Sequence, residues 1–312
     1  MTTLFENVVV VTRKTELEEL IERYNTKAQA KFYLEQGGYS IEALEAAHEK
    51  HHEVLNSVRR SIPRSTKYQL IHRERVPQYM FGDDDLVVTV GQDGLVSNTA
   101  KYLAQQPIFA INPNPELYDG VLLPFKAQEF AAHLKEALRA EKPHQLIQLA
   151  EAKSSSNQTL LAFNDFFIGP RSHVSARYEI EIGGKREYQS SSGIIVSTGA
   201  GSTGWLQSIY AGAAGIVEAL GGSVTPPPNQ GQFPWDSRKL VYSVREPFPS
   251  RATQCSLVHG YISIEDPLIV TSKMGQNGFI FSDGVESDNL EFNAGTTLTI
   301  RTSKRQARLL SP

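Results

Sequence analysis

The chain has 312 residues, of which 40% are hydrophobic and 21% are charged, and this composition excludes a disordered, collagen-like or coiled-coil protein. The length exceeds one typical domain and provides enough apolar residues for two cores. A net charge of -3 and a pI near 6.3 leave no surplus of positive charge for a nucleic acid, so none is expected as a partner.

The N-terminal residues do not form a basic start followed by an apolar stretch, so no export signal is expected. No apolar run approaches the roughly 20 residues needed to cross a bilayer, and the mean hydropathy is -0.30. The single cysteine, Cys255, cannot form an internal disulfide and is expected to be a small core residue. We therefore expect a soluble, cytoplasmic protein that does not act at a membrane.

The first half of the chain alternates between strand and helix patterns. Residues 5–12 (FENVVVVT) contain the continuous apolar run that is typical of a strand buried on both faces of a parallel sheet. Because strand, helix and strand alternate, the sequence predicts an α/β domain with a parallel open sheet over residues 1–142. Helical periods cover 16–36, 41–61 and the stretch between the last two strands, and further strands are expected at 68–72, 86–90 and 107–111.

After Lys142 the pattern changes to short alternating segments, which predict a mostly antiparallel, β-rich domain of the sandwich type over residues 143–312. A helix is expected after Gly201, and a loop rich in glycine and proline follows it over 221–234. Strands are expected at 145–150, 160–168, 174–182, 194–198, 239–244, 261–264, 268–271, 278–281 and 297–301.

The first segment with chemical character is Val90-Gly91-Gln92-Asp93-Gly94, which ends the strongest predicted strand and leads into a helix pattern. Ligands bind at this position in open α/β sheets. Free N–H groups at the helix start favour phosphate oxygens, and glycines let the backbone approach them closely. A carboxylate here repels phosphate unless it holds Mg²⁺ or accepts a proton from an attacking hydroxyl. A plain strand-to-helix turn is the alternative.

The second segment is 190–205 (SSSGIIVSTGAGSTGW), a strand followed by a turn rich in glycine and hydroxyl groups and then by a helix. Its small residues leave room for a flat ligand against the backbone, and Trp205 offers a stacking face. In the alternative interpretation, Trp205 belongs to the core and the hydroxyls are helix caps.

The third segment is the pair Asn164-Asp165 inside an apolar strand, LLAFNDFFI. Neighbouring side chains of a strand point to opposite faces, so one of the two is expected to face the interior. Leaving either polar group buried without a partner would cost roughly 1 to 3 kcal/mol. The pair therefore implies a bound polar ligand or a fixed hydrogen-bond network.

These three segments, at this spacing, resemble the signatures of the NAD kinase family, which read approximately GGDGT, NE and DGLIVSTPTGSTAY. The resemblance extends from the first strand to the end of the chain. It is closest to the mitochondrial-type branch, which also has a serine pair before the glycine, a tryptophan at the end of the third motif and a segment like 243–247 (SVREP); the segment 111–115 (INPNP) adds to it.

For the GQDG turn, the resemblance implies that Asp93 contacts the ribose of the phosphoryl acceptor and is the base for its 2′-hydroxyl. It implies that Gly91 and Gly94 lie near the phosphates of ATP, which binds with Mg²⁺. Gln92 replaces the second glycine of the family motif, and Leu95 replaces its threonine. A positive φ at Gln92 would cost on the order of 1 to 2 kcal/mol; without that requirement, its amide can donate a hydrogen bond to a phosphate.

For the acceptor, the resemblance implies that Asn164 and Asp165 hold the dinucleotide, with Asp165 one methylene shorter than the family's glutamate. It implies that Thr203 and Trp205 contact the base and that Ser192 takes the place of the motif's leading aspartate. The family fold is an α/β N-terminal domain and a β-rich C-terminal domain with the site in the cleft, and a homodimer or homotetramer is usual.

Two other patterns compete for a chemical interpretation. Residues 48–52 (HEKHH) satisfy H-E-x-x-H on a predicted helix, which places two imidazoles on one face as in zinc proteases. A third ligand is not recognisable downstream, so a solvated helix face is preferred and no protein-bound metal is expected. Residues 83–85 (DDD) are expected to form a solvated turn, and Asp283-Gly284 a hairpin turn without chemistry.

Three functions remain open. The leading one is ATP-dependent phosphorylation of the NAD 2′-hydroxyl to give NADP. The second is a dinucleotide sensor in which Gln92 has weakened or abolished turnover. The third is a kinase for a lipid or sugar hydroxyl, because GGDG-like loops also occur in other kinases; the motifs of the second half argue against it.

Overall fold

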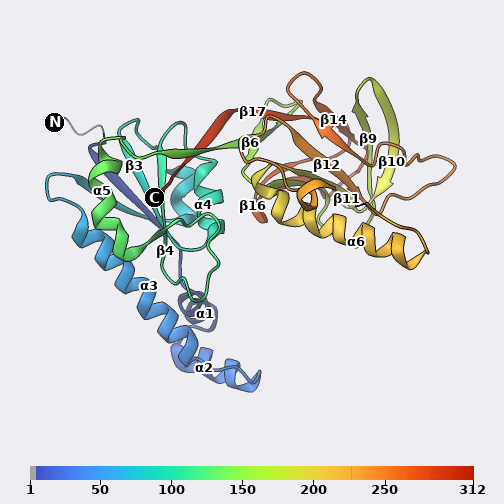
Figure 1. Cartoon of the computed structure of the whole chain (residues 1–312). Helices are drawn as coiled ribbons and strands as arrows, with labels where there is room; N and C mark the ends of the chain where they lie inside the picture. Colours follow the sequence, from blue (N-terminus) through green and yellow to red (C-terminus); the bar gives the residue numbers. More distant parts are fainter. Residues whose placement is uncertain (1–4, 226) are drawn as a thin grey trace. The chain divides into compact units, whose positions relative to one another are not determined.

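The computed structural model describes residues 5–225 and 227–312. The chain divides into two compact units (Figure 1). The first unit comprises residues up to Gln145 together with Ala307–Pro312, and the second comprises Leu146–Gln306. The boundary predicted from the sequence is near Lys142. Residues 1–4 and 226, which belong to the two expected domains, lie outside the described residues.

The first unit contains the predicted parallel sheet. Its strands lie in the order β2 (Lys67–His72), β1 (Asn7–Thr12), β3 (Asp85–Val90), β4 (Pro107–Asn112) and β5 (Phe125–Lys126), and each neighbouring pair is parallel. The three central strands are almost wholly buried because helices cover both faces. On one face, α3 (Glu42–Ser61) and α5 (Phe130–Leu138) join the strands in one apolar cluster, and α4 (Asp93–Ala100) contacts β1, β3 and β4.

The helical stretch expected over 16–36 is two helices, α1 (Glu16–Tyr24) and α2 (Lys27–Gln36). Asn25 separates them with a φ of 65°, a left-handed conformation that asparagine tolerates and that ends a helix. The Thr26 side chain then accepts a hydrogen bond from the Gln29 N–H and starts the next helix.

Helix α3 is fixed to the sheet by a buried histidine. A ring nitrogen of His51 lies 2.9 Å from Oγ1 of Thr12, the last residue of β1. Burial lowers the pKa of His51 to about 4, so its imidazole is neutral at physiological pH. The contact sets the position of α3 along the carboxyl end of β1.

The second unit is built from two sheets that share one hydrophobic core. Phe166 and Val196 of one sheet and Tyr178 and Val270 of the other belong to the same cluster. The first sheet contains β6 (His144–Ser154), β7 (Thr159–Ala162), β9 (Ala176–Ile182), β10 (Lys185–Ser191), β14 (Leu268–Ser272) and β17 (Thr297–Leu310); the second runs in the order β13 (His259–Ile262), β12 (Leu240–Arg245), β11 (Gly193–Ser197), β8 (Asp165–Pro170), β15 (Gly278–Ser282) and β16 (Val285–Glu291).

Strand β17 runs beyond the segment expected at 297–301. It pairs with β14 in the second unit, and its last residues pair with β4 in the first, Arg308 opposite Pro107 and Leu309 opposite Ile108. Leu309 and Leu310 are buried there. The last six residues therefore return to the first unit instead of remaining with 143–306.

Helix α6 (Trp205–Ala219) is the predicted helix that follows Gly201. In the described part of the loop expected over 221–234, the only regular element is a short 3₁₀ turn at Pro228–Gly231. Across residues 5–225 and 227–312, no helix combines the length and the apolar character that a membrane span requires.

Candidate functional site

The GQDG turn lies where β3 ends and α4 begins. Gln92 precedes the first turn of the helix with φ -89° and ψ 168°, an extended conformation that any residue adopts. Its side-chain oxygen accepts a hydrogen bond from Nη1 of Arg13 at 2.9 Å. The glutamine therefore adds no backbone strain, and the positive φ considered for this position is absent.

The two glycines of the turn serve different purposes. A Cβ on Gly91 would lie 2.8 Å from the Cδ2 atom of Leu95, so a larger residue would push against the core side of α4. A Cβ on Gly94 would meet no atom within 4 Å, and this residue is exposed. The start of α4 is therefore open on the Gly94 side, as a helix N-terminus that binds an anion requires.

Asp93 is half-buried in the first turn of α4. Its Oδ1 accepts a hydrogen bond of 2.8 Å from the backbone N–H of Leu122. The carboxylate thus connects the turn to the loop that follows β4. That contact restricts the orientation of the carboxylate, which a catalytic base requires.

A cavity of about 510 Å³ lies beside the turn. Arg13 and Lys14 bring positive charge to it, although Arg13 also pairs with Glu19 at 3.0 Å and Lys14 with Glu22 at 2.7 Å. Its lining combines the end of β1, the turn, α3 and the loop after β4, and includes Arg13, Lys14, Thr15, His48, Gly91, Gln92 and Asn114.

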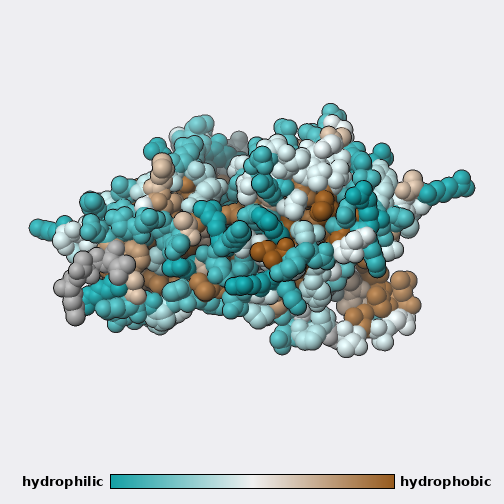
Figure 2. Space-filling view, turned by 90° about the horizontal axis from the view of Figure 1, so that it is seen from above, coloured by the Kyte–Doolittle hydropathy of each residue, from teal (hydrophilic) through white to brown (hydrophobic). Residues whose placement is uncertain are grey.

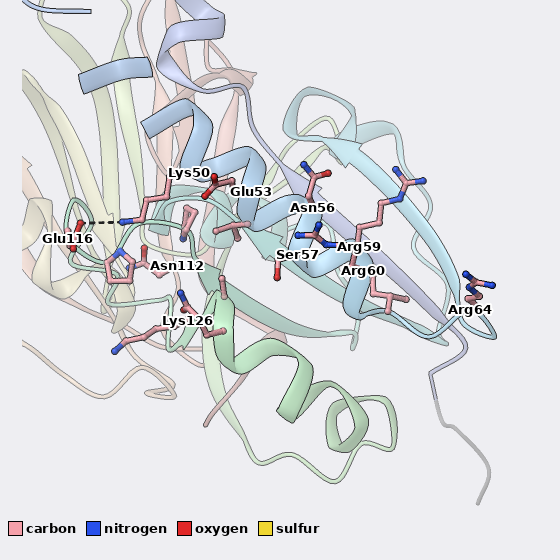
Figure 3. A pocket seen from close by; sticks show the side chains of 16 residues that line it. Lys50, Glu53, Asn56, Ser57, Arg59, Arg60, Arg64, Asn112, Glu116 and Lys126 are labelled. Carbon is pink, nitrogen blue, oxygen red and sulfur yellow. Dashed lines mark hydrogen bonds and ion pairs between the residues drawn. The ribbon is translucent and has the colours of Figure 1, made fainter. Parts of the chain in front are cut away.

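A second cavity, of about 1510 Å³, lies between α3 and the loop after β4 (Figure 3). Lys50 extends across it to Glu116, with Nζ and Oε2 3.2 Å apart, and also donates to Asn114 at 2.9 Å. This cavity cannot be recognised from the sequence, because its basic residues come from separate segments. They are Lys50, Arg59, Arg60, Arg64 and Lys126.

In the second unit, Asn164 and Asp165 are both half-buried at the start of β8. The Asp283 carboxylate holds this segment, accepting hydrogen bonds from the backbone N–H groups of Phe163 (3.1 Å), Asn164 (2.6 Å) and Asp165 (3.3 Å). Burial, together with the Asp283 charge, raises the pKa of Asp165 to about 7. Both the network and a carboxyl group that titrates near neutrality are therefore present.

Asp283 organises the Asn164-Asp165 segment, a role that the sequence does not indicate. The expected hairpin turn is present, with φ 54° at Asp283 and 69° at Gly284 between β15 and β16. The carboxylate, however, also organises the Asn164-Asp165 segment. The Asp-Gly signal describes the local turn alone, and the contact lies 118 to 120 residues away in the sequence.

Backbone from other parts of the chain packs closely against two glycines of the 190–205 segment. A Cβ on Gly199 would lie 2.0 Å from the Pro234 carbonyl oxygen, and one on Gly201 would lie 2.1 Å from that of Asn164. The expected space for a flat ligand is therefore filled at these two positions by the chain's own backbone. Ser197, Thr198 and Ser202 are buried and hydrogen-bonded to nearby carbonyl groups.

Of the residues in this segment that are expected to contact the dinucleotide, Ser192 and Thr203 face solvent and Trp205 packs against an aromatic ring. Ser192 and Thr203 are exposed, and the Ser192 N–H donates to the Arg245 carbonyl. Trp205 is half-buried and stacks on Phe167, with centroids 5.8 Å apart and planes at 10°. The Arg245 guanidinium lies 5.5 Å from the indole centroid. Trp205 is thus held in a fixed orientation by two neighbours.

The acidic run at 83–85 has a structural role at its last residue. Asp85 is buried and accepts hydrogen bonds from Gly82 N–H at 2.9 Å and Asn7 Nδ2 at 2.6 Å. Asp83 and Asp84 are exposed, as expected for a solvated turn.

No protein-family model matches the sequence, and no curated protein matches it. Solved structures do match in fold. Yeast NADH kinase complexed with NADH aligns with a TM-score of 0.60 at 14% identity, covering 98% of this chain and 83% of that one. An NAD kinase from Archaeoglobus fulgidus in complex with ATP aligns with a TM-score of 0.53 at 18% identity, covering 97% and 93%. The chain therefore has the fold of these kinases along nearly its whole length.

Proposed function

We propose that this chain is an NAD kinase that transfers the γ-phosphoryl group of ATP to the ribose 2′-hydroxyl of NAD, giving NADP and ADP. The observation that carries the proposal is the GQDG turn, whose Gly91 and Gln92 line a cavity that also contains cationic side chains, and whose next residue, Asp93, is a half-buried carboxylate at the start of α4. The shared fold with an NADH kinase and an NAD kinase supports it.

In this proposal Asp93 is the general base. It accepts the proton of the 2′-hydroxyl while the hydroxyl oxygen bonds to the γ-phosphorus and the bond to the bridging oxygen breaks, which releases ADP. The N–H of Leu122 fixes the carboxylate through Oδ1. Because phosphoryl transfer depends mainly on positioning and charge, this restriction contributes to the rate.

Gly91, Gln92 and Gly94 are proposed to face the phosphates of ATP. The free N–H groups and the positive end of the α4 dipole favour anions at this point. Arg13 already donates to the Gln92 carboxamide oxygen, so the Nε2 group of Gln92 is the donor left to reach a phosphate. An unstrained Gln92 argues against the alternative of an inactive sensor.

Mg²⁺ is proposed to enter with ATP and to neutralise phosphate charge. This ion commonly binds through substrate phosphates and keeps several waters, so ATP itself can bring it to the turn.

On the acceptor side, Asn164 and Asp165 are proposed to hold the dinucleotide, and Ser192, Thr203 and Trp205 to contact it. The support is the preorganisation of these residues: Asp283 fixes the backbone of the first pair, and Phe167 and Arg245 fix the indole. Asp165 can accept a hydrogen bond when ionised and donate one when protonated, because its pKa is about 7. Both NAD and NADH are candidate acceptors, and the mitochondrial-type branch is the proposed relationship.

The chain is also proposed to form a homodimer or a homotetramer and to act in the cytoplasm. Supporting the assembly, the C-terminal end of α6 exposes apolar side chains such as Ile216 (64% exposed), and Leu220 just beyond the helix is 83% exposed. Figure 2 shows brown side chains gathered at the end of α6.

The test compares the purified chain with two variants at Asp93. Wild-type protein with ATP, Mg²⁺ and NAD or NADH should form the 2′-phosphorylated product. Asp93→Asn should lose about 10²- to 10⁴-fold in kcat while NAD still binds, because the carboxamide oxygen can still accept the Leu122 N–H but cannot take a proton. Asp93→Ala should lose activity and also stability, since the loop contact disappears.

Binding of NAD without turnover by the wild-type chain would favour the sensor. Phosphorylation of a lipid or sugar in preference to NAD would favour the third function.

A further inference from the structure

Three potential metal ligands converge between α1 and α3. Glu18, His48 and His52 each offer one ligand atom, and these atoms all lie within 4.8 Å of one another. The two histidines are one helical turn apart, with ring centroids separated by 4.4 Å. Nε2 of His52 lies 3.2 Å from Oε1 of Glu18. The third ligand expected downstream of H-E-x-x-H is thus found upstream, in α1.

The cluster is held by the hydrogen bonds that start α1. Oε2 of Glu18 accepts from the Thr15 backbone N–H at 2.7 Å and from the Thr15 hydroxyl at 3.2 Å. Nδ1 of His48 lies 2.8 Å from the same hydroxyl oxygen. When the Thr15 hydroxyl donates to Glu18 and Nδ1 of His48 donates to that hydroxyl, Nε2 of His48 carries the lone pair that a metal needs.

The neighbouring groups of H-E-x-x-H do not belong to the cluster. His51 is buried against Thr12. Glu49 is exposed and is not among the clustered ligands. The cluster thus combines the two histidines of the motif with Glu18 of α1, and leaves His51 in its contact with the sheet.

We propose that Glu18, His48 and His52 bind a divalent transition-metal ion of the Zn²⁺ class, which links α1 to α3 at the rim of the cavity beside the GQDG turn. Two imidazoles and a carboxylate form a recognised zinc ligand set, with a fourth position left for water. Imidazole ligands favour Zn²⁺, Ni²⁺ or Cu²⁺ over Mg²⁺, which takes oxygen ligands, so this site differs from the one that the ATP-bound ion would use.

The proposed metal site lies at the wall of the cavity beside the GQDG turn. His48 and Thr15 line the same cavity as Gly91 and Gln92. The side chains of His52 and Glu18 remain 44% and 34% exposed, so an ion can enter from solvent. A bound ion would join two helices that otherwise meet through polar contacts here, and would thereby restrict one wall of the cavity. This inference does not depend on the proposed phosphotransfer.

The experiment measures Zn²⁺ binding by the metal-free full chain, using calorimetry and competition with a chromogenic chelator, with Co²⁺ absorption as a probe of coordination. One equivalent of Zn²⁺ should bind, and His48→Ala, His52→Ala and Glu18→Gln should each weaken binding at least about tenfold. Circular dichroism checks that each variant folds. Glu18→Gln can keep one oxygen for the Thr15 N–H, so it preserves the start of α1.

The matched controls are His133→Ala and Glu49→Gln. His133 also pairs with a carboxylate on its helix, Glu136 at 3.9 Å, but is not among the clustered ligands; Glu49 belongs to the motif but not to the cluster. Both controls should bind Zn²⁺ like the wild type. The proposal is overturned if the wild-type chain binds no stoichiometric Zn²⁺, or if folded ligand variants bind it as tightly as the controls do.

Discussion

Replacing Gln92 with glycine tests whether its side chain obstructs the turn. The backbone of Gln92 is extended, and Arg13 holds its carboxamide, so glycine relieves no strain and removes one hydrogen bond. We expect Gln92→Gly to change kcat/KM for ATP by less than about tenfold, a difference of roughly 1.4 kcal/mol. Steady-state kinetics check this. A large gain in activity would instead mean that glutamine blocks the phosphate position.

Asp165 should make stability depend on pH in a distinctive way. Its pKa is about 7 in the folded chain and near 3.8 when unperturbed, so between these values the folded state holds a proton that the unfolded state has released. Its contribution to stability is therefore present below pH 3.8 and is lost as the pH rises to 7.

Asp165→Asn removes this titration. The unfolding free energy of the variant minus that of the wild type should rise between pH 4 and 8 by on the order of 3 kcal/mol. Urea denaturation at several pH values measures it, and taking the difference cancels the other carboxyl groups. A difference that stays constant with pH would contradict the assigned pKa.

For a single residue, the sequence predicts that a buried polar group needs a hydrogen-bond partner, but it does not identify that partner. Asn164 and Asp165 interrupt an apolar strand, and a fixed network was one of the two outcomes expected. Asp283 could not be found, because a hairpin signal concerns neighbouring residues whereas the contact depends on how β8 and β15 pair.

Among the structural elements, the turn after β11 depends on backbone packing that glycine permits. Gly201→Ala would place a Cβ 2.1 Å from the Asn164 carbonyl oxygen, whereas Gly212→Ala on α6 would meet no atom within 4 Å. We expect the first to destabilise the chain by about 3 kcal/mol or more, and the second to stabilise it by about 0.5 to 1 kcal/mol. Denaturant unfolding distinguishes them; similar values for both would refute the close approach.

The same turn shows what motif composition cannot predict. Its glycines and hydroxyls indicate close approach, but the sequence does not say whether a ligand or the chain itself fills the space. The bounds of the helices differ from the predicted ones for local reasons. Asn25 divides the helical stretch predicted over 16–36 into two helices. The buried strands β1, β3 and β4 agree with the prediction, because a short continuous run of apolar residues is typical of a strand that is buried on both faces.

For the whole molecule, the assembly can be tested on α6. Leu220→Glu places a charge on an apolar residue that is 83% exposed, so it should cost little in the isolated subunit but disrupt an interface. Analytical ultracentrifugation should show a shift to smaller species, while Val174→Glu, at another exposed apolar residue (61%), should leave the size unchanged. An unchanged mass for Leu220→Glu would exclude α6 from the interface.

The order of strands and helices predicted an α/β region followed by a β-rich one, and both are present in the structure. The return of residues 307–312 to the first unit was not predicted. Those residues continue a strand pattern, and their pairing with β4 depends on tertiary structure.

The most direct test of the proposed chemistry is to identify the product formed from ATP, Mg²⁺ and NAD by the wild-type chain. An NADP-specific dehydrogenase, which reduces NADP but not NAD, should detect an amount of product equal to the ADP released. Asp93→Asn should form both products at least about 100-fold more slowly. NAD that remains unphosphorylated, with ATP intact and the protein folded, would contradict the proposal that the GQDG turn transfers a phosphoryl group.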